Sequence, residues 1–140
     1  MRTKAISAIF FAMLLGLGGI ATAAPALASA SVVSVSDGQI SGKGTAVSGT
    51  YTVTCSFFDE NINISMELRQ RTGKTVNSTS FYDSFQCAGD GVPVTRPYIF
   101  AGSSTIFKQG VATITGIANG NVCCYYNVNE VINEEIQLLK

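Results

Sequence analysis

Strict alternation of apolar and polar side chains over residues 47–55 is the clearest pattern in the chain. Val47, Tyr51, Val53 and Cys55 fall on one side of that alternation, and hydroxyl-bearing residues separate them. A period of two is typical of a β-strand with one buried face. We therefore predict a strand over residues 47–55, and it ends in a cysteine that needs a partner.

A second alternation covers residues 61–70 and is even more regular. Its apolar positions are Ile62, Ile64, Met66 and Leu68. A helix would turn residues two apart by about 200° and scatter these side chains around its axis, so the pattern favours a strand.

The segment that follows, residues 71–74, contains Gly73, which suits the positive φ of a short hairpin turn. We expect residues 75–87 to return antiparallel to residues 61–70. Asp83 shares a face with Phe81 and Phe85 in that second strand, and this misplaced charge predicts a β-bulge.

The remaining segments are shorter and less regular. Residues 31–36 predict a first edge strand, and the glycines of residues 39–45 indicate a turn or an irregular edge. Residues 92–100 contain Pro93 and Pro97, which demote them to an edge strand or a loop.

Residues 110–117 predict a strand, and Asn119-Gly120-Asn121 indicates a turn after it. A short extended segment, 122–126, follows that turn. Residues 130–139 fit either a helix or a strand, and we favour a strand because a sandwich of antiparallel strands needs a closing one. Short strands separated by Gly, Asn and Asp turns predict an all-β antiparallel sandwich of about 7–8 strands.

The N-terminal residues 1–30 have the organisation of a secretory signal peptide. Arg2 and Lys4 precede an apolar run, and small residues around Ala28 and Ala30 suit cleavage. A membrane anchor is the alternative, but the run is short and lacks a stop-transfer flank. We expect cleavage after Ala30, with Ala28 as the alternative. We also expect a single domain over residues 31–140 and a secreted, extracellular protein with no membrane partner after cleavage.

Charge and composition exclude several classes of function. Nine basic and nine acidic side chains give no net charge, and without Arg2 and Lys4 seven basic residues face nine acidic ones. Because the chain has no basic patch, nucleic acid is a poor candidate for its partner. The chain has no histidine, which removes serine–histidine and cysteine–histidine catalysis and makes zinc a poor candidate.

Acidic pairs occur at Asp59-Glu60 and Glu134-Glu135, but neighbouring carboxylates do not face each other as glycoside hydrolysis requires. With Asp90, the first pair offers oxygen ligands for calcium, yet the spacing of a calcium loop is missing. We expect no catalytic residue, no cofactor and no metal site, and hence a protein that is not an enzyme.

The four cysteines all follow the predicted leader, where an oxidising compartment favours disulfides. Cys55 and Cys87 each end a predicted strand on its apolar face, and we favour a bond between them. Closing a loop of about 33 residues stabilises the fold by roughly 3.7 kcal/mol in the chain-entropy model. Cys123 and Cys124 are then either both free or bonded to each other, which would strain the peptide between them.

Two segments are candidates for interaction with a partner. One follows Cys87 and contains Asp90, Val92, Pro93 and Arg96, in a stretch stiffened by prolines. The other contains Tyr125 and Tyr126, of which one must point away from the core if the chain is extended. An outward aromatic side chain can stack on a sugar or contact a protein.

Several short motifs together resemble a family of small exported actinobacterial proteins. They are Thr50-Tyr51 with Cys55, then Leu68-Arg69-Gln70, residues 87–91, and residues 107–112. The resemblance implies a single immunoglobulin-like sandwich with one disulfide, and it transfers no active site. Two departures are the Cys123-Cys124 pair and the missing tryptophan after the second cysteine.

The function predicted from these observations is a secreted, non-enzymatic binding or interaction domain whose partner is an unknown protein or cell-surface ligand. One alternative is a secreted inhibitor of a protease or another hydrolase, suggested by the proline-rich stretch after Cys87. The other is a small bacteriocin-like toxin, suggested by size and export.

Overall fold

The computed structural model describes residues 31–55, 61–87, 91–102, 106–122 and 126–140, without the side chains of residues 31–33, 122 and 126–128. This part of the chain forms eight β-strands and one 3-10 turn and contains no α-helix. The all-β prediction is therefore confirmed. The predicted leader, residues 1–30, lies outside the described residues.

The elements follow the chain in this order: β1 Ser31–Val35, β2 Gly38–Ser41, η1 Gly42–Gly44, β3 Ala46–Thr54, β4 Asn61–Thr72, β5 Thr75–Gln86, β6 Pro93–Ala101, β7 Gly110–Val122 and β8 Tyr126–Leu139. All eight strands belong to one sheet. β6 pairs along the whole of β3, so β1 and β2 share the other edge of β3. β2 also pairs with β8 in parallel, and β7, β4 and β5 continue the sheet antiparallel.

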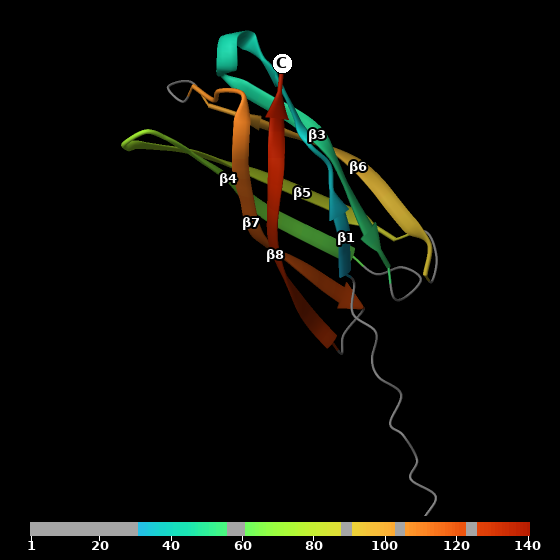
Figure 1. Cartoon of the computed structure of the whole chain (residues 1–140). Coiled ribbons are helices and arrows are strands. Elements are labelled where there is room, and N and C mark those ends of the chain that lie inside the picture. Colours follow the sequence, from blue (N-terminus) through green and yellow to red (C-terminus); the bar gives the residue numbers. More distant parts are fainter. Residues whose placement is uncertain (1–30, 56–60, 88–90, 103–105, 123–125) are drawn as a thin grey trace, which may run out of the picture.

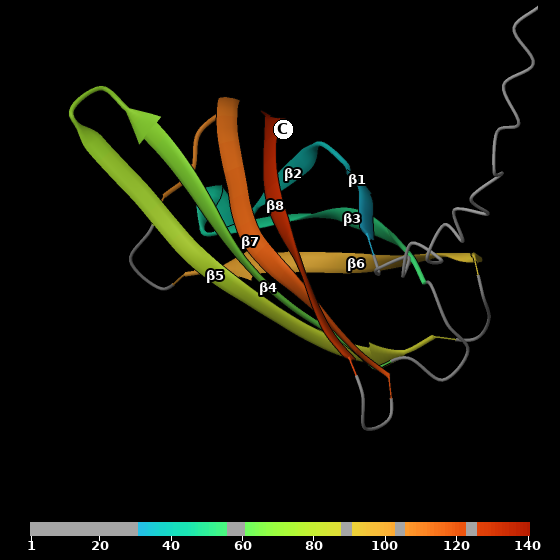
Figure 2. The same cartoon turned by 90° about the horizontal axis from the view of Figure 1, so that it is seen from below.

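The sheet curls so that its two halves face each other around one core (Figures 1 and 2). Alternate residues of β3, β4, β6, β7 and β8 point inward, and among the fully buried ones are Tyr51, Ile64, Tyr98, Ile114 and Leu138. Burying a side chain of this size contributes about 1.5–3 kcal/mol. The alternation seen in the sequence thus identifies the inner face correctly.

Side chains, not a backbone ladder, join β5 to β6 where the curled sheet meets itself. The Cys55–Cys87 disulfide connects the residues after β3 and β5, with 5.9 Å between their Cα atoms. Thr79 on β5 donates a hydrogen bond to the carbonyl oxygen of Ala101 on β6, 3.0 Å away. The ring centres of Phe81 and Phe100 lie 5.9 Å apart in an edge-on contact. The predicted disulfide is confirmed, and it belongs to this closing seam.

The bulge predicted at Asp83 is wrong. The pairing of β4 with β5 runs without a register shift from Asn61–Gln86 to Thr72–Thr75, and Asp83 stands directly opposite Ile64. Its inward-facing charge is matched by Arg96 on β6, which forms an ion pair of 2.6 Å with it. A partner from another strand therefore removes the need for the chain to turn the acid outward.

The turn predicted at Asn119-Gly120-Asn121 is also wrong. These residues continue β7, which pairs with β4 on one side and with β8 on the other. Two backbone ladders stabilise the strand enough to override the turn preference of asparagine and glycine. The final segment is a strand, as favoured, and β8 begins at Tyr126.

The structure divides the irregular N-terminal stretch, residues 39–45, between β2 and the turn η1. β6 is an edge strand, as its two prolines indicated, and Pro93 and Pro97 stand opposite Thr54 and Thr50 of β3. The proline-rich stretch is therefore mostly strand and not the free loop expected of an inhibitor.

Candidate functional site: a lysine-rimmed pocket

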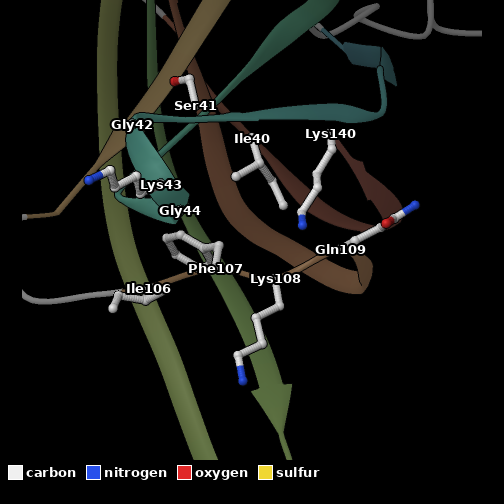
Figure 3. Close-up of a pocket in the computed structure, with 10 residues that line it drawn as sticks. All are labelled: Ile40, Ser41, Gly42, Lys43, Gly44, Ile106, Phe107, Lys108, Gln109 and Lys140. Atoms are coloured by element: carbon white, nitrogen blue, oxygen red, sulfur yellow. The ribbon is translucent and has the colours of Figure 1, made fainter.

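Three segments far apart in sequence surround a surface pocket of about 690 Å³ at one end of the sheet (Figure 3). They are the end of β2 with the turn η1, the stretch 106–109 before β7, and the last residue of the chain. Its lining residues are Ile40, Ser41, Gly42, Lys43, Gly44, Ile106, Phe107, Lys108, Gln109 and Lys140. We call this site the lysine pocket.

The turn η1 adopts an unusual backbone that places Lys43 at the rim. Gly42, Lys43 and Gly44 all have positive φ angles, of 58°, 60° and 97°. For a residue with a side chain, this left-handed conformation costs about 1–2 kcal/mol. In the described part of the chain, Lys43 is the only non-glycine residue with a positive φ angle. The surrounding fold therefore holds its backbone in a conformation that the residue disfavours.

Gly44 also permits the close approach of the opposite wall. A Cβ atom at this position would lie 2.6 Å from the carbonyl oxygen of Phe107. With no side chain in the way, the Phe107 N–H donates to the Gly44 carbonyl oxygen over 2.8 Å. This bond joins η1 to the stretch 106–109 and sets the width of the pocket.

A buried glutamine anchors the second wall to β4. Gln70 is only 3% exposed, and its side chain accepts a hydrogen bond from the Lys108 N–H at 2.8 Å and donates to the Lys108 carbonyl oxygen at 2.6 Å. Asn77 of β5 donates to the carbonyl oxygen of Ile106 over 2.7 Å. The backbone of the stretch is thus fixed from two strands, while the side chains of Ile106, Lys108 and Gln109 remain exposed.

The pocket combines cationic side chains with an apolar wall. Lys43, Lys108 and Lys140 extend from the three segments, and none of the described residues that line the site is acidic. In Figure 3 Lys140 reaches in beside Ile40, whereas the amines of Lys43 and Lys108 point outward on other sides of the opening. Phe107 is 2% exposed below η1, and Ile106 is 55% exposed. This chemistry suits an anionic group attached to an apolar one.

A second polar cluster lies at the seam between β5 and β6. Asp83 accepts hydrogen bonds from the Tyr51 hydroxyl at 2.5 Å and from Arg96 Nε at 2.6 Å, and the Arg96 guanidinium stacks 4.9 Å over the ring of Phe85. Burial opposes ionisation of Asp83, but the bonds from Arg96, Tyr51 and the Ser84 N–H outweigh it and lower its pKa. Burial and the bond to Asp83 raise the pKa of Tyr51 above its ordinary value. The members of the cluster bind one another across β3, β5 and β6, which gives the cluster a structural role.

Of the candidate interaction residues predicted from the sequence, the structure describes the side chains of Val92, Pro93 and Arg96, which lie in or beside β6. Arg96 is engaged with Asp83 on β6, and Pro93 is the first residue of that strand. Val92 precedes it and is 53% exposed. Tyr126 begins β8, but its side chain is not described.

Asp90, Cys123, Cys124, Tyr125 and the pair Asp59-Glu60 lie outside the described residues. In the part that is described, no three acidic, cysteine or histidine side chains are grouped as metal ligands. No helix there has the length and apolarity to cross a membrane.

Comparisons with known proteins add little about the site. No protein-family model matches the chain, and no curated protein matches it. Among solved structures, the chain is similar to the sporulation control protein Spo0M of Bacillus subtilis, with 14% sequence identity and a TM-score of 0.40. The match covers 79% of this chain and 49% of that one, so the chain spans about half the length of that structure.

Sequence reasoning missed the lysine pocket because its walls come from residues near positions 40, 107 and 140. One local signal was present, since a lysine between two glycines, as in Gly42-Lys43-Gly44, suits a left-handed turn. Phe107, Lys108 and Gln109 stood out only as part of a family resemblance. Nothing in the sequence pattern indicated that the two stretches meet.

Proposed function

We propose that this chain is an exported, non-enzymatic binding domain, and that the lysine pocket receives an acidic group of its ligand. The observation that carries the proposal is that Lys43, Lys108 and Lys140 stand on different sides of one pocket with an apolar wall, and that none of the described residues lining it is acidic. Export is supported by the disulfide, which is typical of oxidising compartments, and by the leader-like N-terminus.

We include an immunoglobulin-like fold in this proposal, and the arrangement of the strands supports it. β1, β3 and β6 form one half of the sheet, and β8, β7, β4 and β5 form the other. β2 passes from the first half to the second by pairing with both β3 and β8. Domains of this architecture commonly present ligand sites at the ends of their sheets, which is where the lysine pocket lies.

The expected binding free energies limit the affinity that the lysine pocket can have for a ligand confined to it. Covering about 100 Å² of apolar surface contributes about 2.5 kcal/mol. Each exposed ion pair adds about 0.5 kcal/mol, because water screens the charges and flexible lysine stems must be ordered. A total near 4 kcal/mol corresponds to a dissociation constant of about 1 mM. A small anion should therefore bind weakly, and a tight ligand must extend beyond the pocket.

Calorimetric titration with decanoate, a carboxylate with an apolar tail, tests the proposal. We expect weak, saturable binding that the double variant Lys108→Glu/Lys140→Glu weakens at least about tenfold, since two attractions become repulsions. Lys74→Glu, a lysine at the β4–β5 turn that does not line the pocket, provides the matched control. Equal loss of binding in both variants would contradict a role for the pocket.

The inhibitor and toxin hypotheses lack a comparable observation. The stretch proposed as an inhibitory loop pairs with β3 from Pro93 onward. Both hypotheses remain predictions that inhibition assays on extracellular hydrolases and growth assays on neighbouring strains can address.

A further inference from the structure

The outer surface of β5, β4, β7 and β8 carries a regular array of amide side chains. Asn63 stands opposite Ser84 on one side and Asn119 on the other, and Asn119 stands opposite Asn129. The neighbouring row contains Asn61 opposite Asn121. We call this surface the amide face; its residues are Asn61, Asn63, Ser65, Tyr82, Ser84, Ile117, Asn119, Asn121, Asn129 and Val131.

The spacing of a sheet makes this array regular. Adjacent strands lie about 4.8 Å apart, and residues two apart along a strand about 6.8 Å apart. Each asparagine presents two hydrogen-bond donors and a carbonyl oxygen with two acceptor sites. The amide face thus offers both hydrogen-bond donors and hydrogen-bond acceptors. Their spacing is comparable to the distances between the hydroxyl groups around a sugar ring.

Tyr82 supplies an aromatic surface next to the amides. Its side chain is 67% exposed although it lies in the middle of β5. The Tyr82 hydroxyl and the Ser84 hydroxyl both donate to the Asn63 side-chain oxygen, each over 3.0 Å. These bonds hold the tyrosine in place and leave the Asn63 amide nitrogen without a protein acceptor in the described part of the chain.

A shallow hollow of about 350 Å³ lies in the same surface. Its polar lining comes from the short side chains of Ser65, Ser80 and Thr115 together with Glu67 and Asn119, and Ile117 adds an apolar patch. Glu67, the acid at its border, is neutralised by Arg69 at 2.7 Å. The surface that a ligand would touch therefore carries no unpaired charge.

From this juxtaposition we infer that the amide face binds a neutral glycan, with one sugar ring against Tyr82 and its hydroxyl groups on the asparagine amides. This site is separate from the lysine pocket and does not depend on the function proposed for it. A second copy of the chain fits less well. Ile117 and Val131 offer only a narrow apolar strip, and burying the amides against protein without matched partners would be unfavourable.

Titration of the isotope-labelled, secreted protein with cellohexaose, xylohexaose and chitohexaose, followed by amide NMR shifts, tests the inference. At least one oligosaccharide should shift the amide signals of β4, β5 and β7 around Ser65, Tyr82 and Asn119. Tyr82→Ala and Asn119→Ala should each weaken that binding about tenfold. Tyr82→Phe keeps the ring and should retain most of it.

Val76→Ala is the matched control, because Val76 lies on the same side of β5 and is 62% exposed but stands outside the amide face. It should bind as the unaltered protein does. Absence of shifts with all three sugars would overturn the inference, as would full binding by Tyr82→Ala and Asn119→Ala together. Sedimentation showing self-association lost on Val131→Asp, without any sugar-induced shift, would assign the face to a second copy instead.

Discussion

Asp83 is a partly buried acid that helps to close the curled sheet. Its carboxylate faces inward from β5 and binds Tyr51 of β3 and Arg96 of β6. Because one carboxylate accepts from donors on two other strands, an amide in its place removes the negative charge beside Arg96 and turns one acceptor oxygen into a donor that faces other donors. An unsatisfied buried group of this kind destabilises a protein more than the loss of an exposed ion pair does.

Asp83→Asn should therefore lower the free energy of unfolding by about 1–3 kcal/mol, measured by urea denaturation. Glu67→Gln is the control, since it removes an ion pair with the exposed Arg69 and should change stability little. Equal stability of Asp83→Asn and the unaltered protein would mean that the cluster contributes nothing to the seam.

The same carboxylate should give stability a defined pH dependence. Its pKa in the folded protein is lower than the value near 3.9 of an unfolded chain. The stabilisation is complete above the unfolded pKa and is lost as pH falls through the folded pKa. The stability difference between the unaltered protein and Asp83→Asn should stay constant from pH 7 to about pH 5 and shrink below about pH 4. A difference that grows on acidification would contradict this assignment.

At the scale of single elements, the turn η1 depends on Gly44 for two separate reasons. Its φ of 97° disfavours a side chain, and a Cβ atom would meet the Phe107 carbonyl oxygen. Gly73 in the β4–β5 turn has a φ of 63° but open space around it. Gly44→Ala should thus destabilise the protein more than Gly73→Ala, by about 1 kcal/mol or more. Thermal unfolding of the two variants measures the difference, and equal melting temperatures would contradict it.

The Cys55–Cys87 disulfide holds the seam at which the curled sheet closes. It joins the ends of β3 and β5 and encloses β4 with its hairpin. Cys55→Ala/Cys87→Ala should lower the free energy of unfolding by about 2–4 kcal/mol, chiefly by freeing the unfolded chain. Urea denaturation measures this loss, and a double variant as stable as the unaltered protein would show that the other side-chain contacts hold the seam.

Elements with a clean alternation could be predicted from the sequence, and those decided by distant partners could not. β3 and β4 follow from their own residues, because a period of two defines the buried face. Asp83 suggests a bulge in β5 when only its neighbours in sequence are considered, because its partner Arg96 comes from another strand. Asn119 and Gly120 looked like a turn because local preference does not register the two neighbouring ladders. The lysine pocket was unpredictable for the same reason.

At the scale of the whole molecule, the curled sheet carries two surfaces of different chemistry. The lysine pocket at one end is cationic with an apolar wall, and the amide face is neutral and polar. The seam is held by other side chains, namely the Asp83–Arg96 ion pair and the Cys55–Cys87 disulfide. The residues that stabilise this molecule and those proposed to bind ligands are therefore separable by mutation.

The most direct test of the central claim, that the lysine pocket binds an anionic ligand, is an amide NMR titration with two amphiphiles of similar tail length and opposite charge. Decanoate should shift the signals of Ile40, Lys43, Phe107 and Lys108 in a saturable way that added salt weakens. Decyltrimethylammonium should leave these signals unchanged. Equal shifts with both amphiphiles, or no shift at these residues with decanoate, would contradict the account.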